Sequence, residues 1–393
     1  MRILLAHNRY ALRGGEDSVF DHEVEMLRNH DHEVEQYLKL NADLPKPGPV
    51  GGIALAAGTV FSRTNYREVL DAIDRFRPDV VHVHNTLPQI SPSIYFAAAK
   101  RGLPVVQTLH NYRLLCANGL LMRDQRVCED CVGRRVMVPA VRHKCYRDSV
   151  AASAAVATML GIHRAIGTYR SKVTMYIALT EFSRSKLLEA GLNPEDVVIK
   201  PNFAADIHGD AALTSTRTGA LFVGRLAEEK GVRVMAQAWR DLEVDLKVLG
   251  EGPLAPLLAK GSAPDRIDLR GFVSGDALAE SMRTSSFIVM PSLVYEGFPM
   301  VVAEAYAAGL PIVASRLGAL GEVVEDGVTG LHFEAGDAAD LAAKVRWANE
   351  HPDEMARMGR NARERYLERY TPESNHKRLI EIYEEAQRRV AAG

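Results

Sequence analysis

Short apolar runs alternate with longer amphipathic stretches along most of the chain. Runs such as Ala220 to Val223 and Phe287 to Met290 predict buried strands, because parallel strands covered on both faces read as nearly continuous apolar segments. Between such runs, apolar residues recur at helical spacing, as in Val19 to Leu27. This alternation through both halves predicts an α/β fold of two doubly wound parallel-sheet domains facing a cleft.

Composition narrows the class of protein. The chain has 393 residues, of which 25% are charged and 47% hydrophobic, as expected of a globular protein with two or three domains. The net charge of -2 gives no electrostatic basis for binding nucleic acid. No apolar stretch has spanning length, and the start, MRILLAHNRY, lacks signal-peptide features. We expect a cytoplasmic protein with peripheral contact at the inner face of the plasma membrane.

The stretch from Met290 to Ser315 carries the clearest chemistry. After the strand that ends at Met290, a loop leads to Pro299, which suits the first helical position because proline has no N–H to satisfy there. A small-residue helix follows, and Gly309 is its expected C-cap. Glu296 lies in the loop and Glu304 in the helix, on either side of a helix start that favours anions. Two acids around an anion site suit a sugar diphosphate.

Glu296 and Glu304 have seven residues between them and are flanked by EGFP and GLPIVAS. This segment resembles the E-x7-E signature of retaining GT-B glycosyltransferases, and in particular glycosyltransferase family 4, the glycosyl transferases group 1. The resemblance implies two Rossmann-like domains and a nucleotide-sugar donor. It implies that Glu304 binds the ribose hydroxyls and Glu296 the transferred sugar. The predicted donor site also includes the turn and helix start: Gly297, Phe298, Pro299, Met300 and Val301.

A second motif lies after the strand Ala220–Val223. The run GRLAEEKG places Arg225 and Lys230 around one loop, where two cations could meet diphosphate oxygens. It resembles the family motif G-R-x-x-x-x-K-G, which implies that both side chains hold the donor diphosphate and stabilise the leaving group without a metal.

The first half contributes further candidates. Gly14 and Gly15 follow the first strand, where paired glycines let a ligand approach the backbone. They resemble the glycine-rich N-terminal loop of the family, which implies that they bind the donor through its phosphate and also contact the acceptor. Glu16 and His84 are predicted on the acceptor side. Thr-Leu-His, ending at His110, resembles the T-x-H segment of the family, which implies an active-site histidine that positions and polarises. His82 lies on the same side of its strand as His84, but no carboxylate nearby in the sequence supports a metal pair.

All four cysteines fall within an insert at about residues 113–150: Cys116, Cys128, Cys131 and Cys145. The C-x-x-C pair suits a tetrahedral metal site, with the other two thiolates completing a structural zinc site. Buried free thiols and a redox pair are the alternatives. The resemblance does not bear on this feature.

Residues 134–172 are rich in arginine and lysine around an apolar, alanine-rich stretch, Val150 to Ile162. One interpretation is a packed helix with a solvated charged face. The other is a patch that meets an anionic membrane or a phosphorylated acceptor.

The domain boundaries follow from the pattern and the resemblance. We expect an acceptor-side domain at 1–205, a nucleotide-sugar domain at 206–371, opened by a polar linker at 206–218, and a final helix at 372–393 that returns to the first domain. Residues 42–62 and 318–330 are predicted to be a surface excursion and a turn-rich segment.

The predicted function is a hexosyltransferase-type retaining glycosyltransferase. It would pass a sugar from a nucleotide-diphosphate donor to a hydroxyl of a glycan or lipid-linked acceptor in cell-envelope or exopolysaccharide synthesis, with no cofactor required for the chemistry. The alternatives are a nucleotide-sugar 2-epimerase on the same fold and a catalytically silent partner of another transferase.

Overall fold

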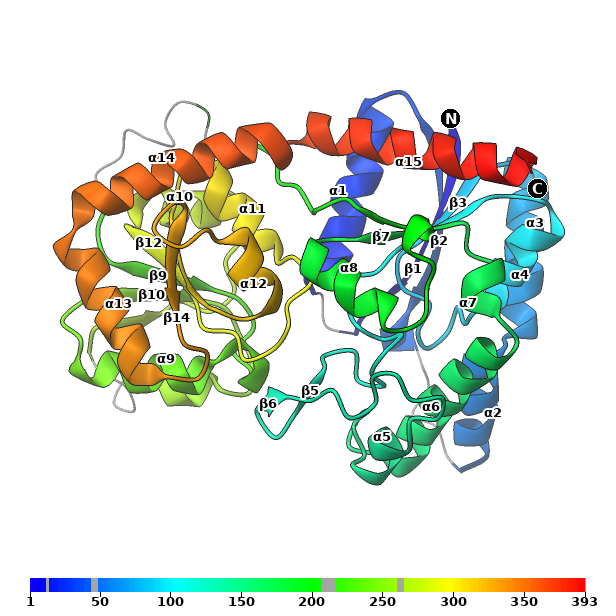
Figure 1. Cartoon of the computed structure of the whole chain (residues 1–393), viewed down its shortest axis with the longest axis horizontal. Helices are drawn as coiled ribbons and strands as arrows, with labels where there is room; N and C mark the ends of the chain where they lie inside the picture. Colours follow the sequence, from blue (N-terminus) through cyan, green and yellow to red (C-terminus); the bar gives the residue numbers. More distant parts are fainter. Residues whose placement is uncertain (12–13, 44–48, 207–208, 210–216, 260–264, 393) are drawn as a thin grey trace. The chain divides into compact units, whose positions relative to one another are not determined.

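The chain folds into two compact units, as seen in a computed structural model (Figure 1). The structure describes residues 1–393 except 12–13, 44–48, 207–208, 210–216, 260–264 and 393. Unit 1 comprises Met1–Leu121, Glu129–Lys200 and His376–Gly393, and unit 2 comprises Met122–Cys128 and Pro201–Asn375. Most of the expected linker at 206–218 lies outside the described residues.

Unit 1 is built on a six-stranded parallel sheet with the order β2-β1-β3-β4-β7-β8. The strands are β1 Arg2–Arg9, β2 Glu33–Leu40, β3 Val80–Val83, β4 Val105–Thr108, β7 Met175–Ala178 and β8 Val197–Ile199. Strand β2 pairs with β1 on one side, and the chain then crosses over so that β3 pairs with β1 on its other side. The order of the strands therefore reverses between β1 and β3, and ligands in open α/β sheets bind at the carboxyl ends of strands at such a point.

Helices connect these strands. They are α1 Gly15–Asn29, α2 Pro49–Val60, α3 Arg63–Phe76, α4 Ser93–Lys100, α5 Val138–Arg142, α6 Val150–Ala165, α7 Thr168–Ser171 and α8 Glu181–Leu188, and the last is α15 Pro372–Ala392, which belongs to unit 1 from His376 onward. The expected surface excursion at 42–62 is corrected, because it contains α2. Despite its glycines, this segment is apolar enough to pack on α6.

Unit 2 has a second six-stranded parallel sheet, in the order β11-β10-β9-β12-β13-β14. The strands are β9 Ala220–Val223, β10 Leu246–Leu249, β11 Ile267–Leu269, β12 Phe287–Met290, β13 Ile312–Ser315 and β14 Gly330–Phe333. This order is that of the Rossmann fold, and its reversal lies between β9 and β12. The two doubly wound parallel sheets predicted from the sequence are confirmed.

The helices of unit 2 are α9 Val232–Ala238, α10 Gly275–Thr284, α11 Met300–Ala307, α12 Gly318–Val323, α13 Ala338–Glu350 and α14 Pro352–Arg369. The segment predicted to be turn-rich at 318–330 is corrected, because it contains α12 and the first residue of β14. Short 3-10 turns complete the chain at Asn41–Asp43, Pro194–Asp196, Glu228–Lys230, Trp239–Asp241 and Ala255–Leu258. The two-residue strands β5 Met122–Arg123 and β6 Arg126–Val127 form an antiparallel hairpin.

Each sheet has its own hydrophobic core. In unit 1, Leu4 and Val83 are buried with Leu160 of α6. In unit 2, Trp239 is fully buried, and its indole N–H donates to the carbonyl of Val244 at 2.8 Å, so no polar atom of the ring is left without a partner. None of the helices in the described part of the chain is long and apolar enough to cross a membrane.

Gly231 joins the loop after β9 to the loop after β12. Its φ of 67° is in the left-handed region, and a Cβ built on it would lie 1.7 Å from the carbonyl oxygen of Pro291. The Glu229 carbonyl also accepts a hydrogen bond from the N–H of Leu293 at 2.9 Å. Only glycine permits this close approach, which fixes the position of Lys230.

Replacing Gly231 with alanine should therefore destabilise unit 2 through both backbone strain and overpacking, by roughly 2–4 kcal/mol. The midpoint of urea unfolding measures this change. Gly327→Ala is the matched control, because Gly327 has a φ of 73° but nothing within 4 Å of an added Cβ. We expect the control to cost only about 1 kcal/mol. Equal losses for the two variants would contradict the packing argument.

Candidate functional site

Candidate residues predicted from the sequence of this half lie on the loops that follow β9 and β12, where the strand order of unit 2 reverses. The loop after β9 carries Arg225 and Lys230, and the loop after β12 carries Glu296. Because β9 and β12 are hydrogen-bonded neighbours, both loops leave the same edge of the sheet side by side. The helices that follow them, α9 and α11, start at this edge.

Lys230 and Glu296 form the centre of this arrangement. The Lys230 ammonium donates to Oε1 of Glu296 at 2.7 Å, and the hydroxyl of Ser292 donates to the same oxygen at 2.7 Å. The Lys230 side chain is 27% exposed and that of Glu296 is 12% exposed, so the pair is only partly screened by solvent. The ammonium has three donors, and it can share one with a phosphate while it keeps the carboxylate.

Helix α11 presents its start at the same place. Pro299 is the N-cap, one position earlier than predicted, and Met300 is the first helical residue. The backbone N–H groups of Met300 and Val301 donate to no acceptor among the described residues. Phe298 contributes to the core, because its ring is buried and lies 5.1 Å from that of Tyr370. The Phe298 carbonyl accepts from the Asn202 amide at 2.8 Å, so the backbone N–H is the group that Phe298 can offer to a ligand. Gly297 lies in the turn just before it.

Glu304 is one turn further along α11. Its carboxylate has no hydrogen-bond or ion-pair partner among the residues that the structure describes, and burial raises its pKa to about 7. The side chain is half-buried, and a carboxylate that is partly removed from water without a partner lowers the stability of the free protein. Hydroxyl donors of a ligand would satisfy it.

Arg225 has a different partner in this structure. Its guanidinium pairs with Glu229 on the same loop, and its side chain is 60% exposed. The structure thus brings Lys230 to the Glu296 turn and leaves Arg225 on the outer part of the β9 loop, from which its long side chain can turn.

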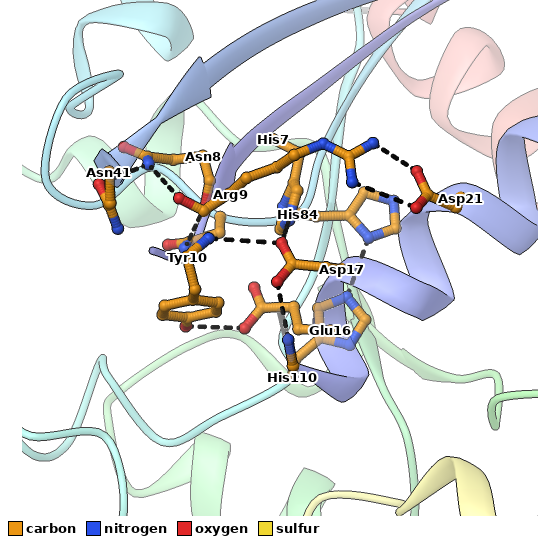
Figure 2. A network of polar contacts seen from close by, with 12 residues as sticks. His7, Asn8, Arg9, Tyr10, Glu16, Asp17, Asp21, Asn41, His84 and His110 are labelled. Atoms are coloured by element: carbon orange, nitrogen blue, oxygen red, sulfur yellow. Dashed lines mark hydrogen bonds and ion pairs between the residues drawn. The ribbon is translucent and has the colours of Figure 1, made fainter. Parts of the chain in front are cut away.

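The corresponding edge of unit 1 carries the glycine-rich loop. Asp17 of α1 holds this loop in place, because one of its carboxylate oxygens accepts from the N–H of Gly14 at 2.9 Å. The other oxygen accepts from His7 at 2.8 Å (Figure 2). A Cβ on Gly14 or Gly15 would have nothing within 4 Å among the described residues. Packing within the protein therefore does not explain the glycines, which leaves open space for a ligand.

Glu16 lies at the first turn of α1, beside this loop. It accepts a hydrogen bond from the Tyr10 hydroxyl at 2.9 Å (Figure 2), and burial raises the pKa of its carboxyl. A carboxyl with a raised pKa at a glycine-rich loop can exchange hydrogen bonds with a polar ligand.

His84 and His110 lie together at the carboxyl ends of β3 and β4. The Nδ1 atom of His84 is 2.9 Å from Nε2 of His110, and the two rings stack (Figure 2). Both residues line a pocket within unit 1, together with Asn111 and Arg113. His110 is half-buried, whereas His84 is 3% exposed.

The expectation that no carboxylate lies near His82 and His84 is wrong. Glu23 of α1 places Oε1 at 3.0 Å from Nδ1 of His82 and 3.1 Å from Nε2 of His84. Glu23 is far from both histidines in the sequence, so adjacency along the chain could not reveal it. Its position on the buried face of the predicted helix Val19 to Leu27 was the available signal.

Comparison with known proteins supports the sequence resemblance. Residues 14–202 match the family described as "Glycosyl transferase 4-like domain", and residues 217–351 match "Glycosyl transferases group 1". The chain belongs to the group 1 glycosyltransferases.

Individual relatives match over part of the chain. An uncharacterised glycosyltransferase of Methanocaldococcus jannaschii is 33% identical over 168 residues, which are 42% of this chain and 47% of the relative. The MMP alpha-(1->4)-mannosyltransferase of Mycolicibacterium hassiacum is 36% identical over 156 residues, 39% of this chain and 38% of that protein. The chain thus spans less than half the length of these curated relatives.

Solved structures extend the likeness in fold to the whole chain. Anabaena HepE in complex with UDP has a TM-score of 0.66 at 17% identity, covering 98% of this chain and 100% of that one. Sucrose-phosphate synthase from Thermosynechococcus elongatus has a TM-score of 0.71 at 16% identity, with 98% of both chains covered. The predicted GT-B fold is confirmed.

The cysteines of this glycosyltransferase family member are divided between the two units. Cys116 and Cys131 are buried and Cys145 is half-buried in unit 1, whereas Cys128 falls in the short stretch grouped with unit 2. The thiol of Cys116 donates to the side-chain oxygen of Asn118 at 2.9 Å. Among the residues that the structure describes in unit 1, Cys116, Cys131 and Cys145 do not bring their sulfurs within reach of one ion.

Structural zinc therefore remains a prediction, and elemental analysis tests it. Protein purified under reducing conditions without chelator should carry about one zinc per chain if the thiolates bind it. The Cys128→Ser/Cys131→Ser double variant should lose it. Metal-free wild-type protein would contradict the prediction and leave buried thiols or a redox pair as the explanation.

The stability of the free protein should respond to Glu304 in a pH-dependent way. The pKa of Glu304 is about 7 in the folded chain and lies near the ordinary 4.5 when unfolded, so the folded state keeps a proton that the unfolded state has lost between those values. Stability therefore falls as pH rises through this window. Glu304→Gln removes the effect, and it should raise the unfolding free energy by about 1–3 kcal/mol at pH 8 and by little at pH 4.5.

Thermal unfolding at both pH values measures this difference. Glu350→Gln is the control, since Glu350 is exposed at the end of α13 and should change neither midpoint. A Glu304→Gln variant that is no more stable than wild type at pH 8 would show that the carboxylate is solvated or already paired.

Proposed function

We propose that the protein is a retaining glycosyltransferase that moves a sugar from a nucleotide-diphosphate-sugar donor to a hydroxyl of a glycan or lipid-linked acceptor. The observation that carries the proposal is the meeting of Lys230, Glu296 and the start of α11 at the carboxyl edge of the unit 2 sheet. This edge combines a cation, backbone donors without an acceptor among the described residues, and a half-buried acid, Glu304. A nucleoside diphosphate bound to a sugar has the complementary groups.

Each group has a role that follows from its chemistry. Lys230 and the N–H groups of Met300 and Val301 would bind the diphosphate, and Arg225 would join them by releasing Glu229. These fixed positive charges would stabilise the negative charge that develops on the leaving nucleoside diphosphate, so the chemistry requires no cofactor. Glu304 would accept hydrogen bonds from the ribose hydroxyls, which would satisfy its unpaired carboxylate.

Glu296 would orient the transferred sugar. Lys230 and Ser292 both bind Oε1 of Glu296, so the carboxylate is held in one orientation before the donor arrives. Such preorganisation avoids an entropic cost on binding. In unit 1, His110, His84, Glu16 and the Gly14–Gly15 loop would contact the sugar and the acceptor.

The comparisons favour transfer over the alternatives. The relatives include a mannosyltransferase, and HepE was solved with UDP, so a nucleotide sugar is the donor class we propose here. No relative described above is an epimerase, and the intact Lys230, Glu296 and Glu304 argue against a silent partner. The role in cell-envelope or exopolysaccharide synthesis rests on the family resemblance and remains part of the proposal.

We also propose that the basic insert of unit 1 contacts an anionic membrane surface. Val136 and Val138 around α5 are 63% and 60% exposed, and Ile166 after α6 is 59% exposed. Exposed arginines and a lysine accompany them: Arg134, Arg135, Arg142, Lys144 and Arg147. Apolar side chains beside cations suit an interface with anionic lipid. In a flotation assay, the protein should float with vesicles of anionic lipid. Equal binding to neutral vesicles would argue against a contribution of the basic side chains to membrane binding.

Lys230→Ala tests the donor site directly. Removing one charge-assisted hydrogen bond to the diphosphate should weaken binding of UDP or GDP, whichever the protein prefers, by about 10- to 100-fold in calorimetry. Sugar transfer should fall at least as much.

Arg233→Ala is the matched control, because Arg233 is exposed on α9 and pairs with Glu228. It should leave nucleotide binding unchanged. Wild-type affinity in Lys230→Ala would place the diphosphate elsewhere. Donor conversion without any acceptor, to a sugar epimer instead of the hydrolysed sugar, would favour the epimerase.

A further inference from the structure

Unit 1 buries a pair of opposite charges close to His84 and His110. Glu23 of α1 is 0% exposed, and Lys200, just after β8, is 1% exposed. The Lys200 ammonium donates to Oε2 of Glu23 at 3.1 Å. Buried charges are costly, so a pair that is fully removed from water calls for a reason beyond stability.

The ionisation of Glu23 is set by these neighbours. Burial alone would raise the pKa of its carboxyl, but the charge of Lys200, together with His82 and His84, lowers it well below its usual value. Glu23 is therefore an acceptor only. The Oε1 atom lies 3.1 Å from Nε2 of His84, so that nitrogen must carry the hydrogen.

The tautomer of His84 determines the tautomer of His110. Burial lowers the pKa of His84 to about 3, so the imidazole is neutral and carries only one N–H. With the hydrogen on Nε2, its Nδ1 is a bare acceptor, 2.9 Å from Nε2 of His110. Nε2 of His110 must then be the donor. Burial also lowers the pKa of His110 well below its usual value, so its Nδ1 carries no hydrogen.

A metal ion is the competing explanation for the cluster. The ligand atoms of Glu23, His82 and His84 lie within 4.8 Å of one another, which is close enough for three ligands of one ion. However, Lys200 already neutralises Glu23, and His82 bonds Tyr383 at 2.7 Å through Nδ1 and Thr108 at 2.8 Å through Nε2. Hydrogen-bond partners thus use the atoms that a metal would need.

We propose that Glu23 and His84 are positioning residues that fix His110 as its Nε2–H tautomer, so that Nδ1 of His110 accepts a hydrogen bond from a hydroxyl of the bound substrate. This inference rests on the proposed function for the identity of the substrate. No covalent bond changes in the relay, and no proton moves. The two hydrogen bonds orient one lone pair, and Lys200 keeps the carboxylate ionised at the buried end.

A fixed tautomer makes His110 selective for a hydrogen-bond donor on the substrate. A histidine free to exchange tautomers would present an N–H donor in part of the molecules and a lone pair in the rest. A fixed lone pair selects a substrate that offers a donor there, which a sugar hydroxyl does. The stacking of the His84 and His110 rings, with centroids 5.1 Å apart, holds the acceptor direction as well.

The tautomers can be read without altering the protein. Long-range proton–nitrogen correlation spectra of wild-type protein labelled on histidine nitrogen should show His84 and His110 with hydrogen on Nε2 and a bare Nδ1. His110→Gln and His84→Gln spectra assign the signals. Hydrogen on Nδ1 of His110, or a mixture of both tautomers, would overturn the proposal. This arm does not depend on transfer activity, so it decides the relay even if the proposed function fails.

Glu23→Gln tests whether Glu23 fixes the tautomer of His110. A glutamine can accept from His84 through its oxygen or donate through its nitrogen, so His110 should become a mixture of tautomers. We expect kcat for transfer to fall about 10- to 100-fold, while the Kd for UDP or GDP, bound through unit 2, stays unchanged. A merely structural role for Glu23 would not change the tautomer.

Glu25→Gln is the matched control, because Glu25 is exposed on the same helix. It should leave the spectra and kcat as in wild type. An unchanged His110 tautomer in Glu23→Gln would contradict the relay. So would a stoichiometric metal in the purified wild-type protein that is lost in His84→Gln. If Glu23→Gln does not fold, the wild-type spectra still decide between the outcomes.

Discussion

The contact on which the candidate site depends is the hydrogen-bonded ion pair between Lys230 and Glu296. Its two residues lie on loops that leave neighbouring strands, β9 and β12, at the point where the strand order reverses. Gly231 lets the loops touch, because its missing Cβ leaves room for the carbonyl of Pro291. A parallel sheet thus collects its polar loops at one edge, and a single close backbone contact sets their spacing.

Each unit has a carboxylate that is wholly or partly removed from water, and the partners of each carboxylate predict its chemistry. Glu304 is half-buried without a hydrogen-bond or ion-pair partner among the described residues, and burial raises the pKa of its carboxyl. Glu23 is buried beside Lys200 and two histidines, which keep it ionised. The first acid is suited to a ligand that brings hydroxyl groups, whereas the second has its donors already and orients its neighbours. The hydrogen-bond and ion-pair partners of Glu23 and Glu304, more than their burial, distinguish the two acids.

Much of the architecture could be predicted from the sequence, because strands buried on both faces read as continuous apolar runs. The bounds of β9 and β12 were predicted at the residues where they lie. The helix α2 was missed, since its glycines and prolines suggested a loop, and β14 was missed within a turn-rich segment. The motifs around Lys230 and Glu296 are local in sequence, and so they were visible. The contacts of Glu23 and Lys200 join segments that are 177 residues apart, and no local pattern reveals them.

We propose above all that the edge of the unit 2 sheet at β9 and β12 binds the diphosphate of a nucleotide sugar. The most direct measurement is a crystal structure with UDP or GDP bound. We expect phosphate oxygens within hydrogen-bond distance of the Lys230 ammonium and of the N–H groups of Met300 and Val301, and ribose hydroxyls that donate to Glu304. A nucleotide bound elsewhere, with Lys230 still paired only with Glu296 and the start of α11 empty, would contradict it.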